Sequence, residues 1–182
     1  INDFRSEDVS KGGQGAPLVP IGDKLLFGDY EICLNIGGIA NLSYDEDGKR
    51  IAYDLCIAYQ ALNYLANMNG FDYDRDGELA RSGKVDITLL KQLNKHPFYG
   101  QLPPKSLGRE FFETYQKELL KDLPVPDMLA TFVEHIALQI ALPISFLPKG
   151  KLLCTGGGAR NKFLIERLQA RTKHEVVMPE KH

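Results

Sequence analysis

The chain of 182 residues has a formal net charge of −2, a pI near 6.1 and 43% hydrophobic residues, which provide for a sizeable core. This charge balance excludes the strongly basic surface that is typical of nucleic-acid-binding proteins. The sequence shows no apolar run of 18 residues and no signal peptide, so we expect neither a membrane span nor secretion.

Three cysteines, Cys33, Cys56 and Cys154, lie in apolar stretches of the sequence. Their odd number and wide spacing favour free, buried thiols in a reducing cytoplasm over a secreted disulfide scaffold. The chain begins at Ile1 rather than at Met and ends just after a predicted strand, so we expect a piece of a longer protein.

The first 22 residues combine Asp3 and Arg5 with a stretch at 12–20 that is rich in glycine and proline. This mixture argues against regular structure. A flexible linker is one interpretation, although the charged triplet at 3–5 is unlike a Gly/Ser linker.

Three strands are predicted over 31–36, 39–45 and 50–56, where apolar residues alternate between short turns. Connections this short predict an antiparallel meander.

The turn between the first two predicted strands consists of Gly37 and Gly38. It can be a plain hairpin turn, because glycine accepts a positive φ without a Cβ clash. It can also be a phosphate site, because the backbone N–H groups of a glycine turn can point at an anion. Asn35 and Asn41 would then add amide donors on either side.

The rest of the chain is predicted to be helical except for two strands. Helices are expected over 58–69, 86–95, 108–121, 127–146 and 162–171, and strands over 151–155 and 175–178. Pro143 should kink the fourth of these helices or end its regular part. A meander followed by helices and a strand–helix–strand unit predicts an α/β fold with a mixed sheet.

A second glycine site follows the predicted strand 151–155. Its candidate ligand-binding residues are Gly156, Gly157, Gly158, Ala159 and Asn161. Glycines permit a close backbone approach, and the following helix start carries partial positive charge. The spacing fits neither a P-loop nor a dinucleotide fingerprint, and a structural strand–helix turn is the alternative. Two glycine turns that each follow an apolar strand indicate a nucleotide held at both ends.

Other polar residues have both a structural and a functional interpretation. Asp54 ends the third predicted strand, where it could hold Mg²⁺ through water or act as a cap. Lys105 and Arg109 lie on one loop and could meet anionic groups of a substrate. The alternative for this loop is a capped helix start with Ser106 as the N-cap.

The acidic stretch 72–77 matches the first half of an EF-hand loop, but Gly83 occupies the position that requires a bidentate Glu. We therefore expect a helix-capping acidic loop rather than a calcium site. The four histidines show no metal-ligand spacing, and His135 is predicted to be structural.

Five motifs in order resemble the anhydro-N-acetylmuramic acid kinase family over nearly all of the chain. They lie at 3–5 with 12–20, at 35–41, at 73–77, at 104–110 and at 156–161. The resemblance implies a ribonuclease H-like lobe of the actin-like ATPase superfamily. In this interpretation residues 1–28 form a glycine-rich active-site segment that joins two lobes. Residues 29–182 form the second lobe, truncated at its C-terminal end.

The resemblance also implies a cytoplasmic enzyme of cell-wall recycling, a kinase that uses ATP, Mg²⁺ and water. Such enzymes open the bridge of 1,6-anhydro-N-acetylmuramic acid and phosphorylate O6, which gives N-acetylmuramic acid 6-phosphate. Asp3 matches the family's catalytic aspartate, the base for the attacking water, and Arg5 lies beside it. The segment 35–41 matches a phosphate-binding segment and 156–159 the adenosine segment.

Further implied contacts are to the sugar, from Gly15, Lys105 and Ser106. The implied partners are the amino sugar, ATP and an N-terminal lobe of the same chain, with a homodimer as a further partner to test. Neither a nucleic acid nor a membrane is implied.

Two departures from the family pattern matter. No Gly-Thr-Ser-x-Asp-Gly phosphate loop occurs, so that half of the ATP site is expected upstream of Ile1, and the isolated chain is expected to be inactive. After Asp54, the residues at 57–59 lack the proline and asparagine that are usual in the family. This second departure favours a rival interpretation, a non-catalytic sugar- or nucleotide-binding module. The intact Asp3 and the two glycine sites favour the enzyme.

Overall fold

The structure is a computed structural model that describes residues 10, 20–120 and 122–179. It contains a mixed five-stranded sheet with the order β3-β2-β1-β4-β5. Asp3, Arg5 and Gly15 lie outside the described residues, so the predictions for them stay predictions.

The meander and the strand–helix–strand unit are both confirmed, with every strand boundary within one residue of its prediction. The strands are β1 Ile32–Ile36, β2 Ile39–Glu46, β3 Lys49–Ile57, β4 Lys151–Thr155 and β5 Glu175–Val177. β1, β2 and β3 pair antiparallel, whereas β4 pairs parallel with β1 and β5 pairs parallel with β4. The predicted α/β class with a mixed sheet is therefore confirmed.

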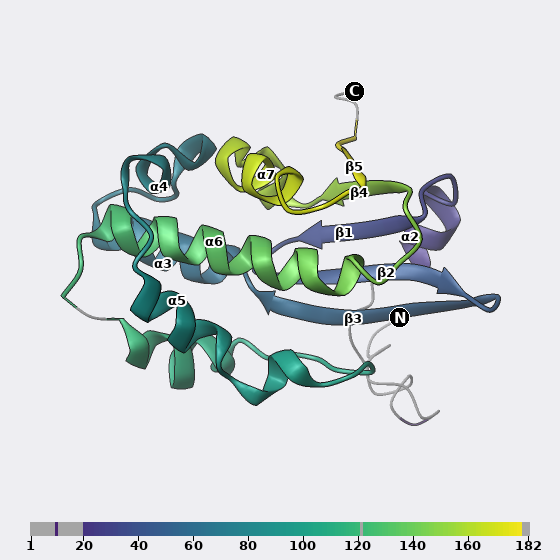
Figure 1. Cartoon of the computed structure of the whole chain (residues 1–182), viewed down its shortest axis with the longest axis horizontal. Helices are drawn as coiled ribbons and strands as arrows, with labels where there is room; N and C mark the ends of the chain where they lie inside the picture. Colours follow the sequence, from purple (N-terminus) through teal and green to yellow (C-terminus); the bar gives the residue numbers. More distant parts are fainter. Residues whose placement is uncertain (1–9, 11–19, 121, 180–182) are drawn as a thin grey trace.

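Helix α6, Val125–Ile144, runs across the sheet and is the core helix of the fold (Figure 1). In the described part of the chain it is the one helix long and apolar enough to span a bilayer, but 72% of its apolar window is buried inside the protein. The helix ends one residue after Pro143, as predicted.

Three further α-helices match their predictions: α3 Tyr59–Met68, α5 Ile87–Asn94 and α7 Lys162–Gln169. Two others were not predicted, α2 Pro20–Leu26 and α4 Glu78–Ser82. Short 3₁₀ turns cover Arg75–Gly77, Pro97–Gly100, Lys117–Leu119 and Gly157–Arg160.

Helix α2 shows why residues 20–22 were wrongly expected to lack regular structure; most of the stretch before them lies outside the described residues. Leu25 and Leu26 are exposed, so the segment has no apolar stripe to signal a helix. The contact with the sheet is polar instead: the buried Asp23 accepts a hydrogen bond of 2.7 Å from the Ser43 hydroxyl on β2.

The prediction of one regular helix over 108–121 is wrong. The segment forms a π-helical turn, Phe112–Gln116, followed by a 3₁₀ turn. The Thr114 hydroxyl donates to the Glu110 carbonyl at 2.8 Å and thereby competes with the α-helical ladder. The wider turn buries both Phe112 and Gln116 completely.

Candidate functional site

The two predicted glycine turns meet at one edge of the sheet. β1 and β4 are parallel neighbours, with Asn35 paired to Thr155, so both strands end at this edge. A Cβ atom on Gly156 would lie 2.5 Å from Asn35 Oδ1 and 2.7 Å from the Ile36 carbonyl oxygen. The second turn therefore packs against the end of β1, directly before the first turn, although the two turns are far apart in the sequence.

The first glycine turn, Gly37 and Gly38, also forms the start of α3. Its carbonyl groups accept hydrogen bonds from the N–H groups of Ala58, Tyr59 and Gln60, at 2.8–3.3 Å. These bonds explain how α3 begins without a side-chain cap. Within the described residues the N–H groups of the turn donate to no backbone carbonyl, so they are available to an anion.

The turn is a hairpin, as one interpretation predicted, but the reason given for its glycines is wrong. Neither Gly37 nor Gly38 has a positive φ. A Cβ on Gly38 would meet nothing within 4 Å, and one on Gly37 would make only an ordinary contact at 3.6 Å. The described fold therefore does not require glycine at either position.

The second glycine turn, residues 156–158, combines two crowded positions with an open one. Gly156 has a φ of +80°, and a Cβ on Gly158 would lie 2.3 Å from Ile36 Cγ2. A Cβ on Gly157 would meet nothing within 4 Å. The fold thus explains the first and third glycines and leaves the middle one unexplained.

A row of polar side chains crosses four strands beside the turns. Thr155, Asn35, Asn41 and Asp54 are successive cross-strand neighbours, so they share one face of the sheet. Asn41 and Asp54 are buried, and Asp54 Oδ2 accepts a hydrogen bond of 2.8 Å from the Leu107 N–H.

The side chains of this row can be compared with the ligands that a magnesium ion prefers. Carboxylate and amide oxygens suit Mg²⁺, which keeps several waters and is commonly bound through one carboxylate and substrate phosphates. The described part of the chain contains no group of three or more His, Cys, Asp or Glu side chains that could hold an ion alone. Asp54 therefore fits magnesium only as a partner to water and phosphate.

Asn161 and Ala159, the last members of the second predicted site, are buried. Asn161 Oδ1 accepts a hydrogen bond of 3.0 Å from the Leu164 N–H and so caps α7. Burial raises the pKa of the Tyr59 hydroxyl, and a hydrogen bond with Asn161 partly offsets that effect. The structure thus gives Asn161 a structural task beside the second turn.

The loop with Lys105 and Ser106 lies along β3, where the Asp54 N–H donates to the Lys105 carbonyl at 3.1 Å. Lys105 Nζ donates to the Phe98 carbonyl at 3.3 Å and lies over the Phe98 ring, and burial lowers the pKa of this amine. Ser106 is exposed and is not an N-cap, because the first turn begins at Gly108, whose carbonyl accepts from Phe111. Sugar contacts from this loop stay a prediction.

The acidic loop has the helix-capping role that was predicted. Asp74 accepts hydrogen bonds from the N–H groups of Leu79 and Ala80 at 2.9 and 3.0 Å, at the start of α4. Asp76 forms an ion pair of 2.9 Å with Lys162 on α7.

The predictions of a structural histidine and of buried thiols are also confirmed. His135 is fully buried between Asn94 and Tyr99, at 2.8 and 3.1 Å, and burial lowers its pKa to about 3. All three cysteines are free and buried.

The sequence interpretation missed a cavity of about 590 Å³ beside the first glycine turn. We call it the Arg109 cavity; its lining residues are Gly38, Ile39, Tyr59, Gln60, Asn63, Tyr64, Asn67, Arg109 and Glu113. Four of them, at 60, 63, 64 and 67, recur with helical spacing along α3. These residues form a polar stripe on the side of α3 opposite its apolar stripe, and this pattern in the sequence could have indicated the cavity.

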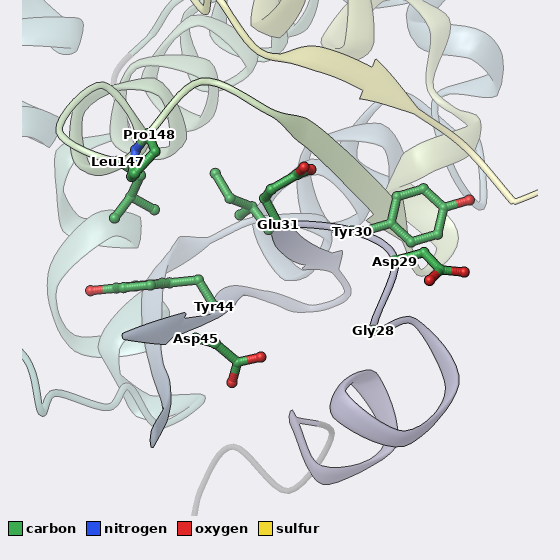
Figure 2. Close-up of a pocket in the computed structure, with 9 residues that line it drawn as sticks. Gly28, Asp29, Tyr30, Glu31, Tyr44, Asp45, Leu147 and Pro148 are labelled. Carbon is green, nitrogen blue, oxygen red and sulfur yellow. The ribbon is translucent and has the colours of Figure 1, made fainter. Parts of the chain in front are cut away.

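A second cavity, of about 290 Å³, lies at the start of β1 and is lined by none of the predicted site residues (Figure 2). Figure 2 shows Tyr30 and Asp29 on one side of it and Tyr44 on the other. The Glu31 carboxylate on its wall accepts a hydrogen bond of 2.7 Å from the Lys151 N–H, which lowers its pKa. This carboxylate ties β1 to β4.

Comparisons with known proteins bear on both fold and family. The family model described as anhydro-N-acetylmuramic acid kinase matches residues 1–181. Curated proteins of that name from Mannheimia succiniciproducens and Aliivibrio fischeri are 40% and 39% identical to the chain and align with 93% of it. The chain covers 50% and 49% of their lengths, so it spans about half the length of these relatives.

Two solved structures share the fold at low sequence identity. The activator of the 2-hydroxyisocaproyl-CoA dehydratase from Clostridium difficile, with bound ADPNP, has a TM-score of 0.54 and 16% identity, over 87% of this chain and 57% of that one. Component A of the (R)-2-hydroxyglutaryl-CoA dehydratase from Acidaminococcus fermentans has a TM-score of 0.55 and 18% identity, over 88% and 59%. The predicted actin-like ATPase fold is confirmed.

Proposed function

The chain belongs to the anhydro-N-acetylmuramic acid kinase family, and from this premise we propose that it is one lobe of such a kinase. The full enzyme would use ATP and water to open 1,6-anhydro-N-acetylmuramic acid and phosphorylate O6, in the cytoplasm, as a step of cell-wall recycling. The observation that carries the proposal is the meeting of two glycine turns at one sheet edge. The single-lobe assignment is supported by the half-length coverage of the relatives.

In this proposal the first glycine turn holds phosphates and the second holds adenosine. Gly37 and Gly38 offer N–H groups without backbone partners among the described residues, next to the amides of Asn35 and Asn41. Residues 156–159 and Asn161 line the adenosine side, where Gly157 leaves room for a close approach. Asp54 would hold Mg²⁺ through water, and the ion would offset phosphate charge.

The sugar chemistry is assigned to residues outside the described part and to the loop beside β3. Asp3 would deprotonate the water that attacks the anomeric carbon, with Arg5 beside it. Gly15, Lys105 and Ser106 would contact the sugar.

The rival, a non-catalytic sugar- or nucleotide-binding module, is favoured by the departure from the family pattern at 57–59. Ile57 and Ala58 are completely buried. Tyr59 is the first residue of α3, and its N–H donates a hydrogen bond to the Gly37 carbonyl. The altered segment thus keeps the first glycine turn attached to α3. The departure at 57–59 therefore provides no structural argument for the rival.

The experiment that tests the proposal is an assay of ADP formation by the full-length protein with 1,6-anhydro-N-acetylmuramic acid, with other sugars as controls. Turnover that depends on the anhydro sugar supports the kinase, and nucleotide binding without turnover supports the rival. The isolated 182-residue chain should bind ATP weakly and turn over no sugar, because phosphoryl transfer depends on positioning by both lobes. Robust sugar-dependent ADP formation by this chain would contradict the single-lobe assignment.

A further inference from the structure

The Arg109 cavity contains a cation that has no ion-pair partner among the described residues. The guanidinium of the exposed Arg109 forms no ion pair with any described residue. The carboxylate on the same wall, Glu113, pairs instead with Lys117 at 3.0 Å. The cavity therefore presents one net positive group, and an anionic ligand group would complement it.

A single side chain fixes Arg109 relative to the first glycine turn. The Gln60 N–H donates to the Gly38 carbonyl at 3.3 Å, and Gln60 Nε2 donates to the Arg109 carbonyl at 2.9 Å. The backbone that carries the guanidinium is thus linked, through one residue of α3, to the turn assigned to phosphates. Gly38 also lines the cavity, so a ligand bound there would lie beside the turn assigned to phosphates.

The remaining lining has the chemistry of a sugar site. Tyr59 and Tyr64 supply aromatic surface, and Asn63 and Asn67 supply amides for hydroxyl and acetamido groups. Asn63 Oδ1 is buried and has no hydrogen-bond partner. Buried acceptors in folded proteins usually have a partner, so this wall of the cavity has an unmet hydrogen-bonding need.

We propose that the Arg109 cavity binds the carboxylate-bearing arm of an acidic amino sugar, and that Arg109 determines specificity for that carboxylate. The inference rests on the proposed function, because it assigns part of the same substrate to this cavity. N-acetylmuramic acid carries a lactyl ether with one carboxylate, and the corresponding N-acetylglucosamine sugar lacks it. A guanidinium recognises a carboxylate with two parallel hydrogen bonds.

The test compares two sugars in the full-length protein: 1,6-anhydro-N-acetylmuramic acid and the same anhydro sugar without the lactyl ether. Arg109→Gln should lower kcat/KM for the muramyl sugar roughly 10- to 100-fold, mainly through KM, because one charge-assisted hydrogen-bonded pair is lost. The value for the sugar without the carboxylate and the KM for ATP should not change. Arg109→Lys should recover part of the loss, because it keeps the charge without the planar fork.

The control is Lys91→Gln, which removes an exposed cation from α5 outside the cavity and should leave both sugars unaffected. Equal losses for both sugars, or a raised KM for ATP, would overturn the inference and assign Arg109 to the nucleotide phosphates. Unchanged kinetics in Arg109→Gln would also overturn it. If the unaltered protein turned over neither sugar, the proposed function would fail first, and the inference with it.

Discussion

The first glycine turn, Gly37 and Gly38, directly follows the end of β1, and the second, residues 156–158, packs against that end, yet the fold constrains the two turns differently. In the second turn, Gly156 needs its positive φ and Gly158 has no room for a Cβ beside Ile36. In the first turn, neither glycine has a positive φ, and a Cβ would meet nothing closer than 3.6 Å. Gly157 resembles the first turn in this respect.

The difference separates two reasons for a glycine in this structure. At 156 and 158 the reason is internal, because neighbouring atoms of β1 occupy the space of a side chain. At 37, 38 and 157 the described residues provide no internal reason. We therefore expect the second group to serve a ligand that approaches the backbone closely.

The largest effect is expected for a residue outside both turns, Asp3. If the two turns only bind the nucleotide, loss of the general base should lower the turnover rate without lowering the affinity for ATP. Asp3→Asn in the full-length protein should therefore keep its affinity for ATP and its melting temperature, yet lose at least about a hundredfold in kcat, because the general base is gone. If Asp3 only pairs with Arg5 to order the glycine-rich segment, the melting temperature should fall instead and kcat should stay near normal.

The next effect concerns stability at the crowded turn. Gly158→Ala would place a Cβ 2.3 Å from Ile36 Cγ2, and such overpacking costs about 1–3 kcal/mol. Urea unfolding should show this loss, whereas the matched variant Gly157→Ala should unfold like the unaltered protein. Equal stability of the two variants would remove the distinction between crowded and open glycines.

The open glycines of the first turn should show the opposite behaviour. Gly38→Ala adds a Cβ that meets no described atom, so the free energy of unfolding should change by less than about 0.5 kcal/mol. The dissociation constant of an ATP analogue should rise about tenfold, which corresponds to about 1.4 kcal/mol. A destabilised variant with normal nucleotide affinity would show that the turn is a plain hairpin.

The smallest effect is expected at the acidic loop 72–77. We expect its role to be structural only, so its variants show what a change in stability without a change in ligand binding looks like. Asp74→Ala should cost about 1 kcal/mol of stability, because it removes the cap of α4, while the exposed Asp72→Ala should cost almost nothing. Calcium titration should show no saturable micromolar binding, because Gly83 supplies no carboxylate. Specific calcium binding that disappears in Asp74→Ala would contradict the capping assignment.

The sequence predicted the sheet better than the helices, for a physical reason. Alternating apolar residues and glycine turns define the strands locally, and every strand boundary lies within one residue of its prediction. Helix α2 was missed because it is held to the sheet by a hydrogen bond from Ser43 to Asp23, which leaves no apolar pattern in the sequence. The π-helical turn was missed because it depends on a side-chain bond from Thr114 to a backbone carbonyl.

The candidate site was predicted in part. The two glycine turns were identified from the sequence, but their contact depends on the parallel pairing of β1 with β4. The Arg109 cavity was missed because Gln60 and Arg109 are joined only by tertiary structure. Local pattern does not encode such long-range hydrogen bonds.

The central claim, that an open glycine in the second turn exists for the nucleotide, is tested most directly by Gly157→Val in the full-length protein. Calorimetry with an ATP analogue and thermal unfolding should be measured on the same sample. We predict that affinity falls at least about tenfold while stability changes by less than about 1 kcal/mol, because the side chain blocks the ligand and a Cβ at this position meets no atom within 4 Å. Unchanged affinity in a folded protein would contradict the assignment of adenosine to this turn.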